Sequence, residues 1–169
     1  MLALSVTPAA ASLGHFDFGY TTASTSPTTG ALINPGGLGN AGAIFGGDKI
    51  VSVAPTAGIG YATGSGGGIT QATSKSTGVT LNKVSGAITM NGAALAAGAT
   101  VGFTMTNSTI SATDVVLVSI RSGGTANSYH IQTSATANGS CVFELRNTSG
   151  GSLSEALVIN FVVIKAVQS

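Results

Sequence analysis

The chain has 169 residues, of which 43% are hydrophobic and 7% are charged, and its formal net charge is +1. An average soluble domain carries roughly 25% charged residues, so this composition predicts that other subunits cover much of the surface. A net charge this small gives no electrostatic footprint for nucleic acid, and we exclude that class of partner.

Residues 1–57 are rich in Gly, Pro, Thr and Ala, and their apolar runs are short. Such a segment cannot offset its own conformational entropy, so we predict an extended, mostly irregular N-terminal arm that is ordered by what it binds. Its sparse apolar side chains are candidate contacts to a partner surface or to neighbouring subunits: Phe16, Phe18, Tyr20, Ile44 and Phe45.

Glycines then follow closely in the stretch GIGYATGSGGG, which begins at residue 58. A dinucleotide site would need a helix that starts at these glycines and a carboxylate about 20 residues further on. No helical pattern follows, and the next carboxylate is Asp114. We therefore predict a hinge between the arm and a second domain, at Gly58, Gly60, Gly64 and Gly66.

From residue 78 onwards the hydrophobic pattern has a period of two, and residues 58–169 are predicted to form a single β domain. Turn-forming runs separate the strands, which is typical of an antiparallel β-sandwich or a jelly-roll-like domain. Residues 91–98 are predicted to form one helical turn, and the continuous run at 114–120 a strand buried on both faces. The predicted strands are 78–84, 87–90, 100–106, 114–120, 128–133, 141–146 and 157–165.

Two serines, Ser65 and Ser122, lie in Ser-Gly-Gly runs similar to the nucleophile loop of chymotrypsin-like proteases. A serine nucleophile needs a histidine base that a carboxylate orients. His15 with Asp17 or Asp48 would have to supply this pair, and too little chain separates them from Ser65 for two barrels. In a chain rich in Ser and Gly we interpret these runs as chance, and we expect neither catalytic residues nor an enzyme.

Metal and cofactor sites are not predicted either. The two histidines, His15 and His130, each lack further ligands nearby, and the five acids are scattered. His130 is expected to point outwards from a strand, and Cys141 is expected to face the core.

The longest apolar run, residues 156–167, contains Asn160 and Lys165 and is shorter than the about 20 residues of a membrane-spanning helix, so no membrane contact is expected. Three N-glycosylation sequons are interpreted as turn chemistry: Asn107, Asn138 and Asn147.

The stretch GYATGSGGGITQATSKSTGVTLNKVSGAITM, residues 60–90, resembles a module that recurs in structural proteins of tailed bacteriophages. The resemblance continues through FTMTNSTISATDVVLVSI (103–120) and SEALVINFVVIKAV (154–167). It covers about two-thirds of the chain, from residue 58 to the C-terminus, and leaves the arm outside.

This resemblance implies an oligomeric β-sandwich in the virion, without catalytic residues. The 57 residues before the module are too few for a long fibre shaft, which favours a decoration (cement) protein on the capsid surface. We expect a homo-oligomer, most simply a trimer, bound to the major capsid protein or another virion protein. The alternative is a receptor-binding tail fibre or spike domain that contacts a glycan or protein of the host surface.

Overall fold

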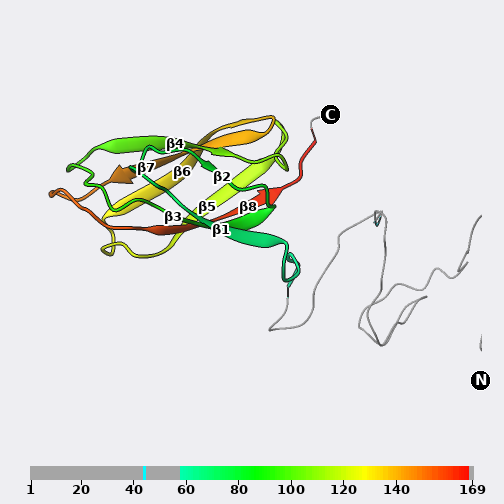
Figure 1. Ribbon diagram of the computed structural model, residues 1–169, viewed down its shortest axis with the longest axis horizontal. Coiled ribbons are helices and arrows are strands. Elements are labelled where there is room, and N and C mark those ends of the chain that lie inside the picture. The colour runs from blue at the N-terminus through cyan, green and yellow to red at the C-terminus, as the bar shows by residue number, and fades with distance from the viewer. Residues whose placement is uncertain (1–43, 45–57, 168–169) are drawn as a thin grey trace, which may run out of the picture. The chain divides into compact units, whose positions relative to one another are not determined.

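The computed structural model describes residue 44 and residues 58–167, and every regular element in this part of the chain is a β-strand (Figure 1). No helix long and apolar enough to cross a membrane occurs among these residues. The strands are β1 (Gly66–Thr70), β2 (Val79–Thr80), β3 (Ser85–Thr89), β4 (Thr100–Thr106), β5 (Val115–Ser122), β6 (Tyr129–Ala137), β7 (Ser140–Asn147) and β8 (Val158–Ile164).

The strands form two four-stranded sheets that pack face to face. Sheet A has the order β1-β3-β8-β5, and sheet B has the order β2-β4-β7-β6 (Figure 1). Both sheets are mixed: β1 runs parallel to β3 and β2 runs parallel to β4, and the other neighbours are antiparallel. The predicted all-β sandwich is confirmed. Its sheets are mostly antiparallel, as predicted, but each also contains one parallel pair.

The core lies between the sheets and is built by the period-two alternation. On β4, Val101, Phe103 and Met105 alternate with threonine and glycine and pack inwards. The ring of Phe143 on β7 meets that of Phe103 edge-on, with 5.7 Å between ring centroids, and lies 6.5 Å from that of Phe161 on β8. The three rings therefore join sheet B to sheet A, as expected of aromatic pairs in a core.

The edges of the sandwich are closed by side chains and short turns. Thr133 on β6 donates from its hydroxyl to the carbonyl of Val116 on β5, at 2.8 Å, which ties the two sheets together on one side. The β6–β7 hairpin turns at Asn138 and Gly139, and Gly139 adopts a φ of +78° that glycine tolerates best.

Three local predictions were wrong. The stretch 91–98 forms no helical turn, because Leu95 instead makes a β-bridge to Leu153. The strand at 114–120 is not buried on both faces, since Val115 and Leu117 on its outer side are about half exposed. Gly66 belongs to strand β1, where it pairs with Ser85, so the predicted hinge ends before it.

Candidate functional site

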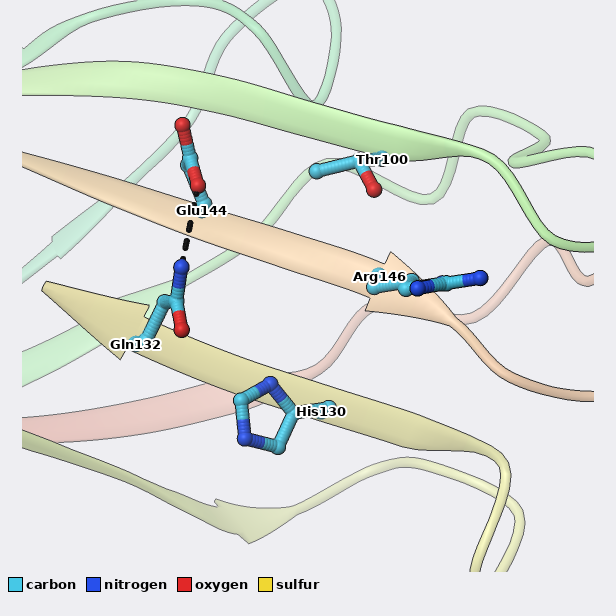
Figure 2. A pocket seen from close by; sticks show the side chains of 5 residues that line it. All are labelled: Thr100, His130, Gln132, Glu144 and Arg146. Carbon is cyan, nitrogen blue, oxygen red and sulfur yellow. Dashed lines mark hydrogen bonds between the residues drawn. The ribbon is translucent and has the colours of Figure 1, made fainter. Parts of the chain in front are cut away.

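Charged and polar side chains gather on the outer face of sheet B, where three strands each present every second residue. The register places Thr100 of β4, Arg146 of β7 and His130 of β6 in one row across the sheet. In the next row, Glu144 of β7 lies opposite Gln132 of β6. Together these five side chains line a shallow hollow of about 280 Å³, and we call this group the sheet B site (Figure 2).

One hydrogen bond orders this site. The amide of Gln132 donates to Oε2 of Glu144 at 3.1 Å, across the two strands (Figure 2). The guanidinium of Arg146 lies apart from that carboxylate, and the ion pair found within residues 58–167 is elsewhere, between Lys165 and Asp114. Gly102 on β4 pairs with Glu144 and has no side chain, and Glu144 and Val142 cover its position at 3.7 and 3.9 Å. The site thus presents an anionic, hydrogen-bonded side chain next to a cationic one without a carboxylate partner.

The outer face of sheet A is different in character. Val115 pairs with Ile164 and Leu117 pairs with Val162, so four apolar side chains stand together on β5 and β8. Of these, Val115, Leu117 and Ile164 are 47%, 51% and 47% exposed. We call these four residues the sheet A ridge.

Beside the ridge the same face is hollowed. A depression of about 570 Å³ begins between Leu117 and Asn160, and a second of about 330 Å³ continues over β3 and β1. The floor of the second is formed by small residues, among them Gly66, Ser85 and Ala87. The ridge and the hollows lie next to each other on one sheet, so a protein surface of complementary shape can pack against this face.

The run TQATSK, residues 70–75, builds a buried polar joint. Gln71 donates from Nε2 to the carbonyls of Lys75 and Thr77, at 3.0 and 2.9 Å, and accepts from the backbone N–H of Asn91 at 3.0 Å. Both ends of its amide are therefore used, as a buried side chain requires. The motif serves the fold.

Lys75 completes this joint. Its side chain is buried, at 3% exposure, and Nζ donates to the carbonyls of Asn91 at 2.6 Å and of Glu155 at 2.5 Å. Burial lowers the pKa of Lys75, and the negative charge of Glu155 opposes this in part. The ammonium thus holds three segments of the chain together at the end of the sandwich opposite the β6–β7 turn.

The carboxylate of Glu155 lies in the same region and is held by the hydroxyl of Thr125, at 2.7 Å from Oε1. Hydrogen bonds from Thr125 lower the pKa of Glu155. Burial, and after it the nearby Glu155, raise the pKa of Tyr129 to about 12. Tyr129 Oη and Glu155 Oε2 are both buried and lack a hydrogen-bond partner of good geometry among the described residues. The negative charge of Glu155 therefore acts on the pKa of Tyr129 through electrostatic repulsion of the phenolate. The arrangement contains an acid, a base and a phenol, and its hydrogen bond between Thr125 and Glu155 is exposed. None of its residues lines the three hollows described above.

The residues predicted from sequence as contacts and as a hinge are only partly within reach of the structure. Phe16, Phe18, Tyr20 and Phe45 lie outside the described residues, and Ile44 is exposed.

Gly58 and Gly60 are exposed and have no atoms near the place where a side chain would start. Gly64 has a φ of +91°, in a turn that the Ser65 N–H closes on the Ala62 carbonyl. Next to them Tyr61 donates from its hydroxyl to the carbonyl of Val163 on β8, at 2.5 Å, which fastens this segment to sheet A.

The geometry of the described residues supports neither a serine nucleophile nor a metal site. Within residues 58–167, neither Ser65 nor Ser122 is hydrogen-bonded to an imidazole or a carboxylate, and no three His, Cys, Asp or Glu side chains gather where they could hold a metal ion. His15, Asp17 and Asp48 lie outside the described part.

Two of the sequon asparagines, Asn107 and Asn147, form the predicted turn contacts, since each accepts from the backbone N–H two residues further on, and both are fully buried. Asn107 donates to the carbonyl of Lys83, and Asn147 donates to those of Leu95 and Gly151.

Comparison with known proteins adds no relative: no family model, no curated protein and no solved structure matches the chain. What the structure defines is the class, an all-β sandwich with one polar and one apolar outer face.

Sequence reasoning found only one member of the sheet B site, His130, which it placed correctly on an outward face. The other four members were missed: Thr100, Gln132, Glu144 and Arg146. A signal for the last three was present, because in SYHIQT and CVFELR the outward positions carry the polar residues. What was lacking was the register between the two strands, which shifts at a bulge between Thr133 and Ala135.

Proposed function

We propose that the chain is a bacteriophage virion structural protein, a capsid decoration (cement) protein that binds and stabilises the head surface as a homo-oligomer. The observation that carries this proposal is the relief of sheet A, with an exposed apolar ridge on β5 and β8 beside a hollow lined by small residues. The bacteriophage-like motifs support it independently.

A second copy of this chain is the occupant that fits sheet A best. In a two-fold or cyclic contact, the ridge of one subunit can enter the hollow of the next, because both features lie on one surface. Arg121 is the charged side chain bordering these hollows, so burial desolvates little charge. The low overall charge of the chain agrees with a surface that is covered in the assembled state.

The oligomer is tested by light scattering on the full chain at low micromolar concentration. We expect a closed oligomer, with the trimer favoured, and we expect Leu117→Lys to shift it to the monomer because a charge then lies on the ridge. Thr104→Lys, an exposed position on the outer face of sheet B, is the matched control and should keep the wild-type mass. A monomeric wild-type protein, or a Leu117→Lys variant of unchanged mass, contradicts the proposal.

The place in the particle is tested separately, by electron microscopy of virions labelled with gold-conjugated antibodies against the chain. Label over the head supports the decoration protein. Label confined to the tail tip supports the alternative, a receptor-binding fibre or spike domain. Particles without label, alongside a positive reaction with the purified chain, refute a virion role.

A further inference from the structure

The sheet B site holds a disproportionate share of the ionisable side chains. The whole chain has six Lys and Arg, five Asp and Glu and two His. One member of each of these groups, Arg146, Glu144 and His130, borders the same hollow on adjacent strands β6 and β7. Three of these thirteen ionisable side chains therefore line this one hollow.

Arg146 and His130 supply the hydrogen-bond donors of the site. They lie directly opposite each other in the β6–β7 register. The planar guanidinium matches a carboxylate with two parallel hydrogen bonds, and an imidazole N–H can add a third. Arg146 forms no ion pair within the described residues, so no internal carboxylate competes for its donors.

Glu144, Gln132 and Thr100 supply acceptors next to these donors. The hydrogen bond from Gln132 engages one carboxylate oxygen of Glu144 and fixes the orientation of both side chains. The second oxygen of Glu144 and the carbonyl of Gln132 can then accept from hydroxyl groups. A ligand with several carboxylates would be repelled by Glu144, whereas one with a single carboxylate and several hydroxyls satisfies both halves of the site.

The dimensions agree with a small ligand. The hollow measures about 280 Å³, which is at the lower end of the roughly 300–1,000 Å³ typical of small-molecule sites. One sugar ring is the size that fits.

We propose that the outer face of sheet B binds a carboxylate-bearing sugar of the hexuronic acid type. Arg146 and His130 hold the carboxylate, and Glu144, Gln132 and Thr100 accept from and donate to the ring hydroxyls. The proposal does not depend on where in a particle the chain is placed, because it uses the face opposite to the proposed subunit contact. No aromatic ring lines the hollow, so we expect a weak dissociation constant of about 1 mM for a single sugar.

The test is a titration of the full chain with glucuronic acid, followed by amide chemical shifts in NMR spectra. Shifts are expected on β6 and β7 around residues 130–132 and 144–146. Glucose, which lacks the carboxylate, and acetate, which lacks the ring, should each bind at least about tenfold more weakly.

Two variants and one control separate recognition from general attraction. Arg146→Gln should weaken glucuronic acid binding at least about tenfold, whereas Arg121→Gln on the outer face of sheet A should leave it unchanged. Glu144→Ala removes a negative charge, so mere charge attraction would strengthen binding of the anion, whereas loss of hydroxyl recognition weakens it. We expect the weakening.

Four outcomes overturn the proposal. They are the absence of shifts up to saturating glucuronic acid, equal binding of glucose or of acetate, an equal effect of Arg121→Gln and Arg146→Gln, and tighter binding by Glu144→Ala. Equal binding of acetate would point to an acidic protein side chain as the partner instead of a sugar.

Discussion

At the scale of single residues, Cys141 reports on the packing between the sheets. Its side chain is 1% exposed, and burial raises the pKa of its thiol to about 12. Because the thiolate is the reactive form, the native protein should not react with an aromatic disulfide reagent at pH 8. Reaction should become stoichiometric in denaturant, and absorbance of the released thiolate measures both. Rapid labelling of the native protein would mean that β7 is not buried as described.

The ion pair between Asp114 and Lys165 predicts a loss of stability in acid. The carboxylate of Asp114 is 2% exposed, and hydrogen bonds from Lys165 and from the backbone of Ser111 lower its pKa. A depressed carboxyl pKa stabilises the folded state at pH values above the unfolded value of about 3.9, and this contribution is lost as pH falls through the folded value. Urea midpoints should therefore fall less steeply from pH 5 to pH 2 in Asp114→Asn than in the wild type.

A second variant checks that the bond itself is responsible. Lys165→Gln removes the same partner from the other side and should flatten the acid dependence in the same direction. If the slopes of both variants equal that of the wild type, other carboxylates govern the acid transition.

Prediction from sequence succeeded for residues whose role is set by their own strand. The buried Cys141 and the outward His130 follow directly from alternation along one segment. Lys75 could not be foreseen as buried, since its carbonyl partners belong to segments 16 and 80 residues away. A charged residue in a polar loop is expected to be exposed unless its distant hydrogen-bond partners are known.

At the scale of elements, the turn after β5 depends on one glycine. Gly123 has a φ of +83°, and a side-chain carbon added there would lie 2.6 Å from the carbonyl oxygen of Ala156. Gly123→Ala should cost at least about 1 kcal/mol of unfolding free energy because it adds left-handed strain to a clash with backbone. Gly150→Ala, at a position with open space, should stay within about 0.5 kcal/mol of the wild type.

Urea denaturation of the two variants measures this difference. Equal stabilities would show that the β5–β6 turn does not hold its backbone against the segment before β8. The Arg-Ser-Gly-Gly run, which resembles a protease loop in sequence, would then lose the structural explanation that Gly123 gives it.

Strand positions were largely predictable, but strand partners were not. Period-two alternation located β4, β6, β7 and β8, because it reflects burial on one side of each segment. Alternation says nothing about direction, so the parallel pairs were missed, and the GGGIT of β1 offers too few side chains to alternate. The run at 114–120 was misread because its second apolar face is exposed within one chain. The proposed oligomer, in which a second copy covers the sheet A ridge, would account for this pattern.

At the scale of the whole molecule, the sandwich should fold without residues 1–57. The buried core described here comes from residues 79–163, and the fastening of Tyr61 to Val163 lies after the cut. A chain of residues 58–169 should therefore show one cooperative thermal transition within a few degrees of that of the full chain, by circular dichroism. An unfolded truncation would place part of the core in the arm and move the domain boundary.

The parallel pairing of β1 has a mechanical consequence. Gly66 lies level with Ser85 and Val162, so the chain enters β1 at the end of sheet A where β8 leaves it (Figure 1). A pull on the entering segment along the strands loads the five register pairs of β1 and β3 in shear, all at once. Pulling handles at Gly58 and Gly150 should therefore require a higher rupture force in optical tweezers than handles at Gly58 and Val167, which open the pairs one after another. Equal rupture forces would show that β1 carries no load. A higher force for the handles at Gly58 and Gly150 would show that the parallel pairing of β1 with β3 resists a pull on the entering segment.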